Sequence, residues 1–444
     1  MTACAIETAA EVGAPRRTGF AITADGTYAA RLTLGSGNGS GGNGNGSGNG
    51  GGTGANGNGR GGTGGREEGG GTGGADAWFP ERWTLDGPEP YAVPLPLDQP
   101  EEPDTDVLPL TDGRVLIRRR VADRHDFSLL YPTGPGTGQV PVGALGCDRL
   151  TLLPPSPDGR SAYALVPGEH STTVWLVAGG AFGPERVAEI AGRCSGGVWL
   201  DRTGRILALD RERDGVVKAV AVDLGRGGEV TPLLQITEES NDRLLLADPD
   251  SGLLLIRSDA PGHDRLGWGV LGSLRPVRFP ECLRLADCAV TPFAVQPGQV
   301  LMPESCAVAL RIDGAAGSGL GVWRPMGRQL HRLPVPQGWL AGAGLWTRDG
   351  VLRLPYATRE VPCGVAGIAA PPEPVTSAAS LEPVRPAALR PAVSRPIASR
   401  PAASAELSQT ESLGMEPSAP PRTPVMCRPV PLQQAPLSGR EAPG

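Results

Sequence analysis

Short apolar runs along this chain follow turns that contain a glycine. Each turn opens with aspartate or proline, and glycine supplies the positive φ that other residues resist. From the second turn to the last, the glycines are spaced by 46, 45, 48, 46 and 52 residues. The chain is therefore predicted to repeat a unit of strand, turn and strand. The seven turn glycines are Gly26, Gly113, Gly159, Gly204, Gly252, Gly298 and Gly350.

The strand after most of these turns is apolar on both of its faces. The second and fourth residues after Gly113 are Val115 and Ile117, and Leu116 between them is also apolar. A strand that is apolar on both faces is buried on both faces, as in a β-propeller blade between two neighbours. The repeat length is also that of a four-stranded blade. We predict an all-β protein, a seven-bladed β-propeller; six or eight blades stay open because the strands after Gly350 are hard to assign.

Tryptophans mark the third strand of several predicted blades. Trp175 and Trp268 each stand sixteen residues after a turn glycine, and we predict that both are core residues. Trp83 stands 57 residues after Gly26, which is 41 more than the sixteen-residue offset of Trp175 and Trp268. This excess nearly equals the length of the Gly/Asn-rich tract. Such a tract cannot bury enough apolar surface to offset the entropy of ordering it. We predict that residues 35–76 are a disordered insertion between the second and third strands of the first blade.

The C-terminal region is rich in proline, alanine and arginine, and Arg-Pro pairs begin at positions 385, 390, 395 and 400. Proline removes hydrogen-bond donors and favours an extended polyproline II chain. We predict a propeller over residues 1–370 and a disordered tail over residues 371–444. Near the N-terminus, the stretch "ACAIETA" could supply the outer strand of the last blade, which has few residues left, and so close the ring.

The "PDG" turns, their spacing and the third-strand tryptophans resemble the TolB-like and WD40-like propeller repeats. This resemblance covers about residues 16–370 and implies the fold without implying an activity. The WD dipeptide of true WD40 blades is absent from the chain, and the GH pair does not recur from blade to blade. The resemblance is therefore to β-propeller repeats in general and not to the WD40 subfamily.

Composition narrows the class of protein. The net charge of −6 argues against a nucleic-acid partner. The chain begins without the basic and apolar regions of a signal peptide, and it has no stretch of about 20 apolar residues. We predict a cytoplasmic monomer without membrane contact, and reduced thiols for eight cysteines that form no CxxC pair. Lys218 is the only lysine, which together with the Ala, Gly and Pro content indicates a GC-rich bacterial genome.

Candidate chemistry is confined to the residues that lead into the turns. Asp148, Asp242 and Asp287 stand near the start of predicted inner strands, where a propeller would place them near one mouth of its channel. Converging carboxylates could bind Ca²⁺ or another divalent cation, and propeller lactonases hold a metal in that way. The opposing interpretation is that such aspartates are structural hydrogen-bonding residues, as the TolB-like repeats imply.

Other motifs give no sign of catalysis. His125, His170 and His263 share an offset from the turn glycines, so we expect them at separate hairpin tips as exposed residues. No GxSxG, P-loop or helix-opening GxGxxG is present. We predict a non-catalytic platform that binds an unknown protein partner and has no cofactor. The alternative is a metal-dependent, lactonase-like hydrolase that uses the acidic residues at the channel mouth.

Overall fold

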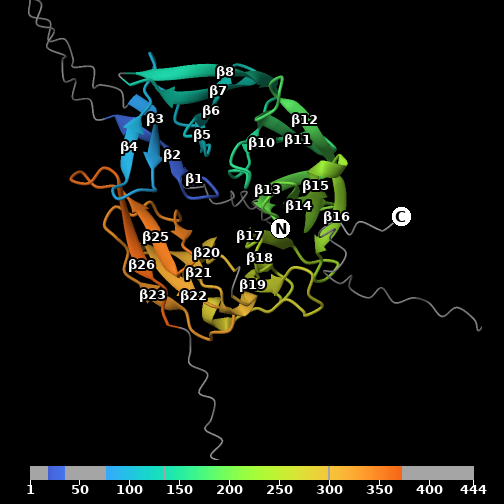
Figure 1. The fold of residues 1–444 in the computed structure, drawn as a ribbon. Helices are drawn as coiled ribbons and strands as arrows, with labels where there is room; N and C mark the ends of the chain where they lie inside the picture. The colour runs from blue at the N-terminus through green and yellow to red at the C-terminus, as the bar shows by residue number, and fades with distance from the viewer. Residues whose placement is uncertain (1–18, 36–76, 135, 299–300, 373–444) are drawn as a thin grey trace, which may run out of the picture. The chain divides into compact units, whose positions relative to one another are not determined.

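The computed structural model describes residues 19–372 except 36–76, 135 and 299–300, and the regular secondary structure of these residues is almost all antiparallel β-sheet (Figure 1). Four sheets contain four strands in sequence order, one contains three, and one contains seven. Three single-turn 3-10 helices, η1 (Leu224–Arg226), η2 (Glu281–Leu283) and η3 (Pro303–Ser305), lie in the connections. The predicted all-β class is confirmed.

The strands of the first three sheets are β1 (Phe20–Ile22), β2 (Tyr28–Gly35), β3 (Ala77–Thr84) and β4 (Tyr91–Pro94); β5 (Asp106–Pro109), β6 (Val115–Val121), β7 (Arg124–Pro132) and β8 (Thr137–Gly146); and β9 (Thr151–Leu152), β10 (Ala162–Pro167), β11 (Ser171–Ala178) and β12 (Glu185–Ala191). The strands of the seven-stranded sheet are β13 (Arg193–Trp199), β14 (Ile206–Arg213), β15 (Val216–Asp223), β16 (Glu229–Leu234), β17 (Asp242–Ala247), β18 (Leu253–Ser258) and β19 (Arg265–Val270). The last two sheets are β20 (Ala289–Val295), β21 (Val308–Gly314), β22 (Gly317–Trp323) and β23 (His331–Leu333); and β24 (Leu345–Trp346), β25 (Val351–Tyr356) and β26 (Gly364–Ala369).

The seven-stranded sheet consists of two antiparallel meanders, β13–β16 and β17–β19. A single parallel residue pair, Lys218 with Asp242, joins β15 to β17. Every other strand pair in this sheet is antiparallel. Counting the two meanders separately gives seven units, although the hydrogen-bonded sheets number six in the part of the chain that the structure describes. The number of seven blades therefore stays a prediction.

Hydrophobic clusters join each of these units to the next. Every cluster draws buried side chains from two consecutive meanders. One of them brings Phe20 and Trp83 of the first sheet together with Val365 of the last sheet and with Ala343, which lies just before β24. The Arg353 side chain also donates a hydrogen bond to the carbonyl oxygen of Leu85 across this junction. The units thus close into a ring, which is the architecture of a β-propeller.

The turn glycines lie between the first and second strands of the meanders, as the repeat predicts. Six of them have φ between 70° and 81°, and Gly298 is the exception. Close approach of the neighbouring unit adds a second requirement for glycine. A Cβ atom on Gly159 would lie 2.3 Å from Cγ2 of Thr111, and one on Gly204 would lie 2.6 Å from Oγ of Ser156. At Gly298 only the close approach applies, since its Cβ would meet Ser251 at 2.3 Å.

Tryptophans occupy the third strand of four units, as predicted. Trp83, Trp268 and Trp323 are 0%, 4% and 0% exposed. Trp175 on β11 is only half-buried, and its Nε1 donates to Oγ1 of Thr173 at 2.9 Å. The core prediction is therefore confirmed for Trp268 and wrong in degree for Trp175, which packs against the edge of a core cluster.

Strands β2 and β3 pair along their whole lengths, from Tyr28 with Thr84 to Gly35 with Ala77. The Gly/Asn-rich tract therefore connects the second and third strands of the first sheet, where the sequence analysis placed it. The predictions of disorder for the tract and the tail, and the closing strand suggested for "ACAIETA", lie outside the described residues.

Replacing residues 36–76 with a two-residue Asn-Gly turn is expected to leave the melting temperature equal or higher. The ends of the tract are already held by the β2–β3 register, and closing a loop of about 40 residues costs about 2–3 kcal/mol. Thermal unfolding of the shortened and full chains checks this expectation. A melting temperature several degrees lower in the shortened chain would show that the tract contacts the fold.

Candidate functional site

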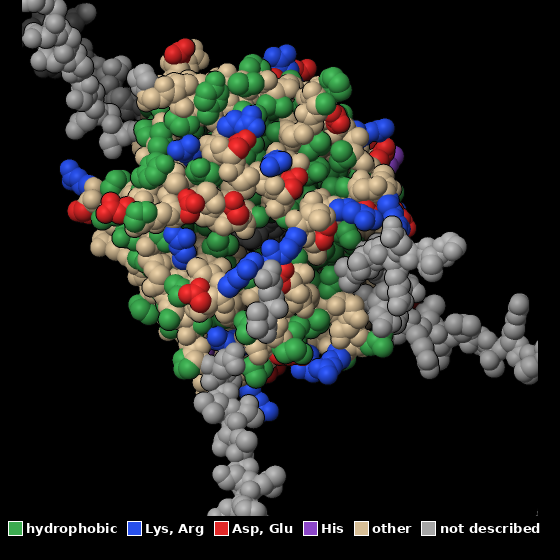
Figure 2. Space-filling view, in the orientation of Figure 1, with side chains coloured by type: hydrophobic (Ala, Val, Ile, Leu, Met, Phe, Trp, Pro, Cys, Tyr) green, Lys and Arg blue, Asp and Glu red, His purple; other side chains and the backbone are tan. Residues whose placement is uncertain are grey.

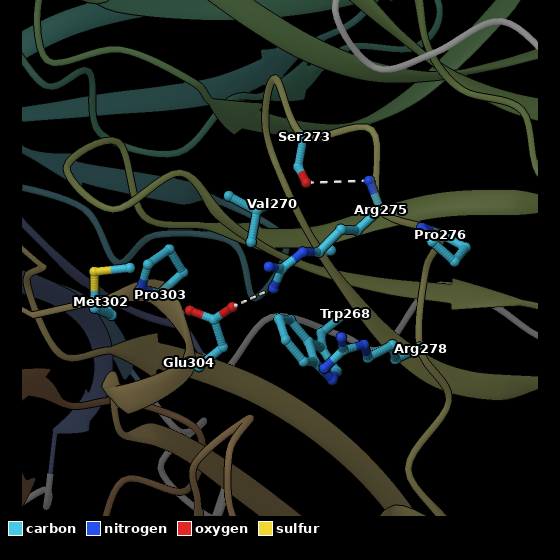
Figure 3. Close-up of a pocket in the computed structure, with 10 residues that line it drawn as sticks. Trp268, Val270, Ser273, Arg275, Pro276, Arg278, Met302, Pro303 and Glu304 are labelled. Carbon is cyan, nitrogen blue, oxygen red and sulfur yellow. Dashed lines mark hydrogen bonds and ion pairs between the residues drawn. The ribbon is translucent and has the colours of Figure 1, made fainter. Parts of the chain in front are cut away.

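A pocket of about 300 Å³ opens between the fifth and sixth meanders (Figure 3). One wall is the end of β19 and the chain that follows it. The other wall is the connection from β20 to β21, at the turn that contains η3. The lining residues are Trp268, Gly269, Val270, Ser273, Arg275, Pro276, Arg278, Met302, Pro303 and Glu304.

The first wall forms because the fifth meander has no regular fourth strand in the described residues. After β19 the chain turns back, with the Ser273 backbone N–H donating to the carbonyl of Val270 at 3.0 Å. It then pairs with β19 at a single residue, where Trp268 and Arg278 exchange backbone hydrogen bonds of 2.9 and 3.0 Å. Pro276 has no N–H to donate, which limits further pairing. The short bridge leaves side chains of this segment free to line a hollow.

The second wall is fixed by backbone contacts around η3. Pro303 starts this single turn, where a missing N–H costs nothing. The Met326 backbone N–H donates to the carbonyl oxygen of Glu304 at 2.9 Å, and the Arg324 side chain donates to that of Ser305 at 3.0 Å. The wall thus holds Met302 at the rim, where its side chain is 69% exposed.

The pocket combines apolar and cationic groups. The Arg278 guanidinium lies over the Trp268 ring at 5.2 Å from its centroid, a cation–π geometry. Arg275 Nη1 lies 3.4 Å from Oε1 of Glu304 across the pocket, as the dashed line in Figure 3 shows. The Arg275 side chain is 71% exposed, and such a loose surface pair contributes little stability. The Arg275 guanidinium is therefore only loosely held by Glu304.

Apolar side chains beside the pocket are unusually exposed. Leu274 stands between the lining residues Ser273 and Arg275 and is 66% exposed. Met302, on the other wall of the pocket, is likewise exposed, at 69%. Over the face drawn in Figure 2, by comparison, Lys and Arg side chains are interspersed with Asp and Glu. No feature of the sequence by itself pointed to this pocket, since its two walls come from different meanders.

Among the predicted metal ligands, Asp242 is fully buried at the start of β17. Its carboxylate accepts hydrogen bonds from Lys218 Nζ at 2.8 Å, the Ile236 backbone N–H at 2.9 Å and Ser258 Oγ at 2.6 Å. Ser240 Oγ donates to both carboxylate oxygens, at 2.9 and 3.0 Å. These donors occupy the lone pairs that a cation would need. In this structure Asp242 anchors the junction of β15 and β17.

The other two aspartates lie in different surroundings. Asp148 is exposed just before β9, and Asp287 is exposed just before β20 with φ of 54°. The described residues contain no group of three His, Cys, Asp or Glu side chains that could hold a metal ion. The three aspartates are therefore not brought together as a ligand set, and the lactonase-like alternative has no such centre in the described part of the chain.

The histidines divide into two groups. His170 and His263 are exposed at hairpin tips, as predicted. The prediction is wrong for His125, the second residue of β7, which is 2% exposed, with Nδ1 3.0 Å from Nη1 of Arg118. Burial lowers the pKa of His125, and the nearby charges of Arg118 and Arg120 lower it further. Arg118 also donates from Nε to Oδ2 of Asp106 at 2.8 Å, so His125 lies beside a paired arginine that the spacing of the histidines cannot reveal.

Sequence reasoning also missed a buried carboxyl group, that of Asp210 on β14. It is 7% exposed and accepts a hydrogen bond from the Leu244 backbone N–H at 3.1 Å. Arg243 Nη1 lies 3.6 Å from Oδ2 of Asp210, and the Arg243 side chain is 41% exposed. Burial raises the pKa of Asp210 to about 6 despite these two interactions.

No protein-family model matches the chain, and a search of curated proteins finds no relative. Solved structures that resemble it include TolB from Acinetobacter baumannii, at 11% identity, with 65% of this chain and 76% of that chain covered and a TM-score of 0.35. Prolyl oligopeptidase B from Galerina marginata matches at 10% identity, with 78% and 45% covered and a TM-score of 0.45. A structure from a mechanistic study of two prolyl endopeptidases matches at 13% identity, with 66% and 45% covered and a TM-score of 0.38.

The chain spans less than half the length of the two prolyl peptidases that it matches. At these sequence identities the resemblance is one of fold alone. The similar structures include TolB proteins, which the turn motifs of the sequence suggested. In the described residues no helix is long and apolar enough to cross a membrane.

Proposed function

We propose that this protein is a non-catalytic binding platform and that the pocket between its fifth and sixth meanders receives an extended segment of a protein partner. The observation that supports this proposal most directly is the exposure of two large apolar residues at a hollow of about 300 Å³: Met302, which lines it, is 69% exposed, and Leu274, between two lining residues in the sequence, is 66% exposed. Exposed apolar groups gathered beside a hollow mark interaction sites more often than scattered ones do.

The residue types suit protein recognition. Tryptophan and arginine are enriched among the residues that contribute most to protein–protein affinity. Methionine adapts its shape to different apolar partners. A hollow of about 300 Å³ is at the small end of ligand sites, which fits one or two side chains of a peptide better than a large cofactor.

The charges define the chemistry of the partner segment. Arg275 is held only by a 3.4 Å contact to Glu304, and Arg278 is exposed above Trp268. A carboxylate beside the inserted apolar side chain would pair with Arg275 in place of Glu304. The partner segment is therefore expected to place an apolar residue next to an aspartate or glutamate.

Photo-crosslinking tests the proposal. With a photoreactive amino acid at position 274, we expect covalent capture of a partner in the native cells. The control is the same amino acid at Phe182, which is 95% exposed on another meander. The binding affinity for the captured partner should then fall about tenfold in Leu274→Ser and in Met302→Ser, which is about 1.4 kcal/mol each. Phe182→Ser should bind as the unmodified chain does. Equal capture at positions 274 and 182, or unchanged affinity in both Leu274→Ser and Met302→Ser, would contradict the proposal.

A further inference from the structure

The end of β19 offers a ligand a backbone donor on the first wall of the pocket. The Leu271 N–H donates to the Gly252 carbonyl at 2.8 Å, so these two residues form a hydrogen-bonded pair. Such pairs alternate with non-hydrogen-bonded pairs along an antiparallel ladder, so the N–H and C=O of Val270, opposite Leu253, point away from β18. The Val270 carbonyl accepts from the Ser273 N–H at 3.0 Å, whereas the Val270 N–H makes no backbone hydrogen bond to a described residue. This position therefore presents a donor without a matching acceptor.

Two side chains of the same wall add further donors. Ser273 Oγ accepts from the Arg275 backbone N–H at 3.2 Å, which leaves its own O–H able to donate to a ligand. The Arg275 guanidinium presents a fork of N–H donors and is directed toward Glu304 across the pocket (Figure 3). An ionised carboxylate only accepts hydrogen bonds, so it is the ligand group that suits such a set of donors.

A peptide that enters the pocket cannot continue along β19 as an added strand. Trp268 and Arg278 exchange backbone hydrogen bonds of 2.9 and 3.0 Å, which occupies the next outward-facing position of β19. On the other side of Val270 the chain itself turns, with a φ of 74° at Gly272. Strand addition draws its affinity from main-chain hydrogen bonds over several residues. One donor at one position suits a single carboxylate oxygen instead.

We infer that the pocket binds the C-terminal residue of its partner, with the α-carboxylate on the Arg275 guanidinium, Ser273 Oγ and the Val270 N–H. This inference rests on the proposed function and narrows the partner to a chain end. A C-terminal residue carries its side chain and its carboxylate on one Cα, which suits a hollow of about 300 Å³. Arg278, exposed over Trp268, is then available to an aspartate or glutamate that precedes the apolar C-terminal residue.

Glu304 competes with the incoming carboxylate for Arg275. Its side chain is 27% exposed, and its contact with Arg275 is 3.4 Å long. A surface pair of this kind is worth little, so a ligand carboxylate with three donors can replace it. Removing the competing charge in Glu304→Gln should therefore tighten the binding of a free C-terminus by about threefold.

Three peptides labelled with fluorescein at the N-terminus test the inference. The first is Gly-Gly-Asp-Leu with a free C-terminus, the second is its C-terminal amide, and the third continues as Gly-Gly-Asp-Leu-Gly-Gly amide. Fluorescence polarisation with the full chain measures the affinity of each. The free C-terminus should bind at least about tenfold more tightly than either other peptide, because only it places a carboxylate beside the leucine side chain.

Arg275→Gln should reduce the difference between the free C-terminus and its amide to less than about twofold. Arg186→Gln is the matched control, because Arg186 lies on another meander, is 57% exposed and pairs with Glu189 at 3.0 Å. It should bind all three peptides as the unmodified chain does. A tenfold preference that survives in Arg275→Gln would overturn the assignment of the carboxylate to this arginine.

Two further results separate this inference from the proposed function. Equal affinity for the three peptides, reduced in Met302→Ser, would overturn recognition of a chain end and leave the partner site in place. No binding of the free C-terminus at about 1 mM protein would overturn the inference as well, since this peptide carries every group that it requires. Crosslinking at position 274 would then still decide the proposed function.

Discussion

Replacing Asp242 with alanine is expected to lower the free energy of unfolding by about 3–5 kcal/mol. The carboxylate is fully buried and accepts bonds from Lys218 Nζ, Ile236 N, Ser240 Oγ and Ser258 Oγ. Removing it leaves those donors without their acceptor, and each unsatisfied buried group costs about 1–3 kcal/mol before relaxation. The melting temperature should fall by on the order of 5–15 °C.

Asp148→Ala is the matched control because Asp148 is exposed. Its unfolding free energy should change by less than about 0.5 kcal/mol. Both variants are to be measured with and without 2 mM CaCl₂. A melting temperature that rises with calcium in the unmodified chain but not in either variant would restore the metal-site hypothesis and contradict the structural role of Asp242.

The repeat could be predicted from sequence because its signals are local. Each turn depends on a glycine with positive φ, and each following strand depends on a run of apolar residues, so both leave marks within a few positions. Gly159 and Gly204 carry a further constraint that spacing does not show, the close approach of Thr111 and Ser156 from the preceding sheet. The same glycine thus supports both the turn and the packing between units.

The role of Asp242 could not be predicted because two of its partners, Lys218 and Ser258, lie on other strands. Lys218 is on β15, and the two residues meet only where β15 and β17 form their single parallel pair. The pocket is equally non-local, since Arg275 and Glu304 belong to different meanders. Spacing indicated that the aspartates recur at strand starts, but their environments depend on tertiary contacts. A recurring position is therefore evidence of a repeat and not of a shared site.

Asp210→Asn is expected to stabilise the protein at neutral pH. The pKa of Asp210 is about 6 in the folded state, above the ordinary value of 3.8. Between pH 3.8 and pH 6 the folded state binds more protons than the unfolded state, so stability falls as the pH rises through this window. The full loss, about 3 kcal/mol, is reached above pH 6. Asparagine cannot ionise and keeps an acceptor for the Leu244 N–H, so the variant should gain up to about 3 kcal/mol at pH 7.5 and almost nothing at pH 4.

Asp223→Asn is the matched control with the opposite sign. Asp223 is 1% exposed, and its hydrogen bonds and ion pair with Arg205 hold its pKa below the usual range. Its charge therefore contributes stability above about pH 4, which is lost as the pH falls through the lowered pKa. Asp223→Asn should lose stability at pH 7.5, whereas Asp210→Asn gains it. Denaturant unfolding at both pH values separates the two cases, because only a carboxyl that is buried without a close cationic partner benefits from losing its charge. The expectation concerns the difference in unfolding free energy between Asp210→Asn and the unmodified chain. If this difference is less favourable to the variant at pH 7.5 than at pH 4, Arg243 compensates the buried charge.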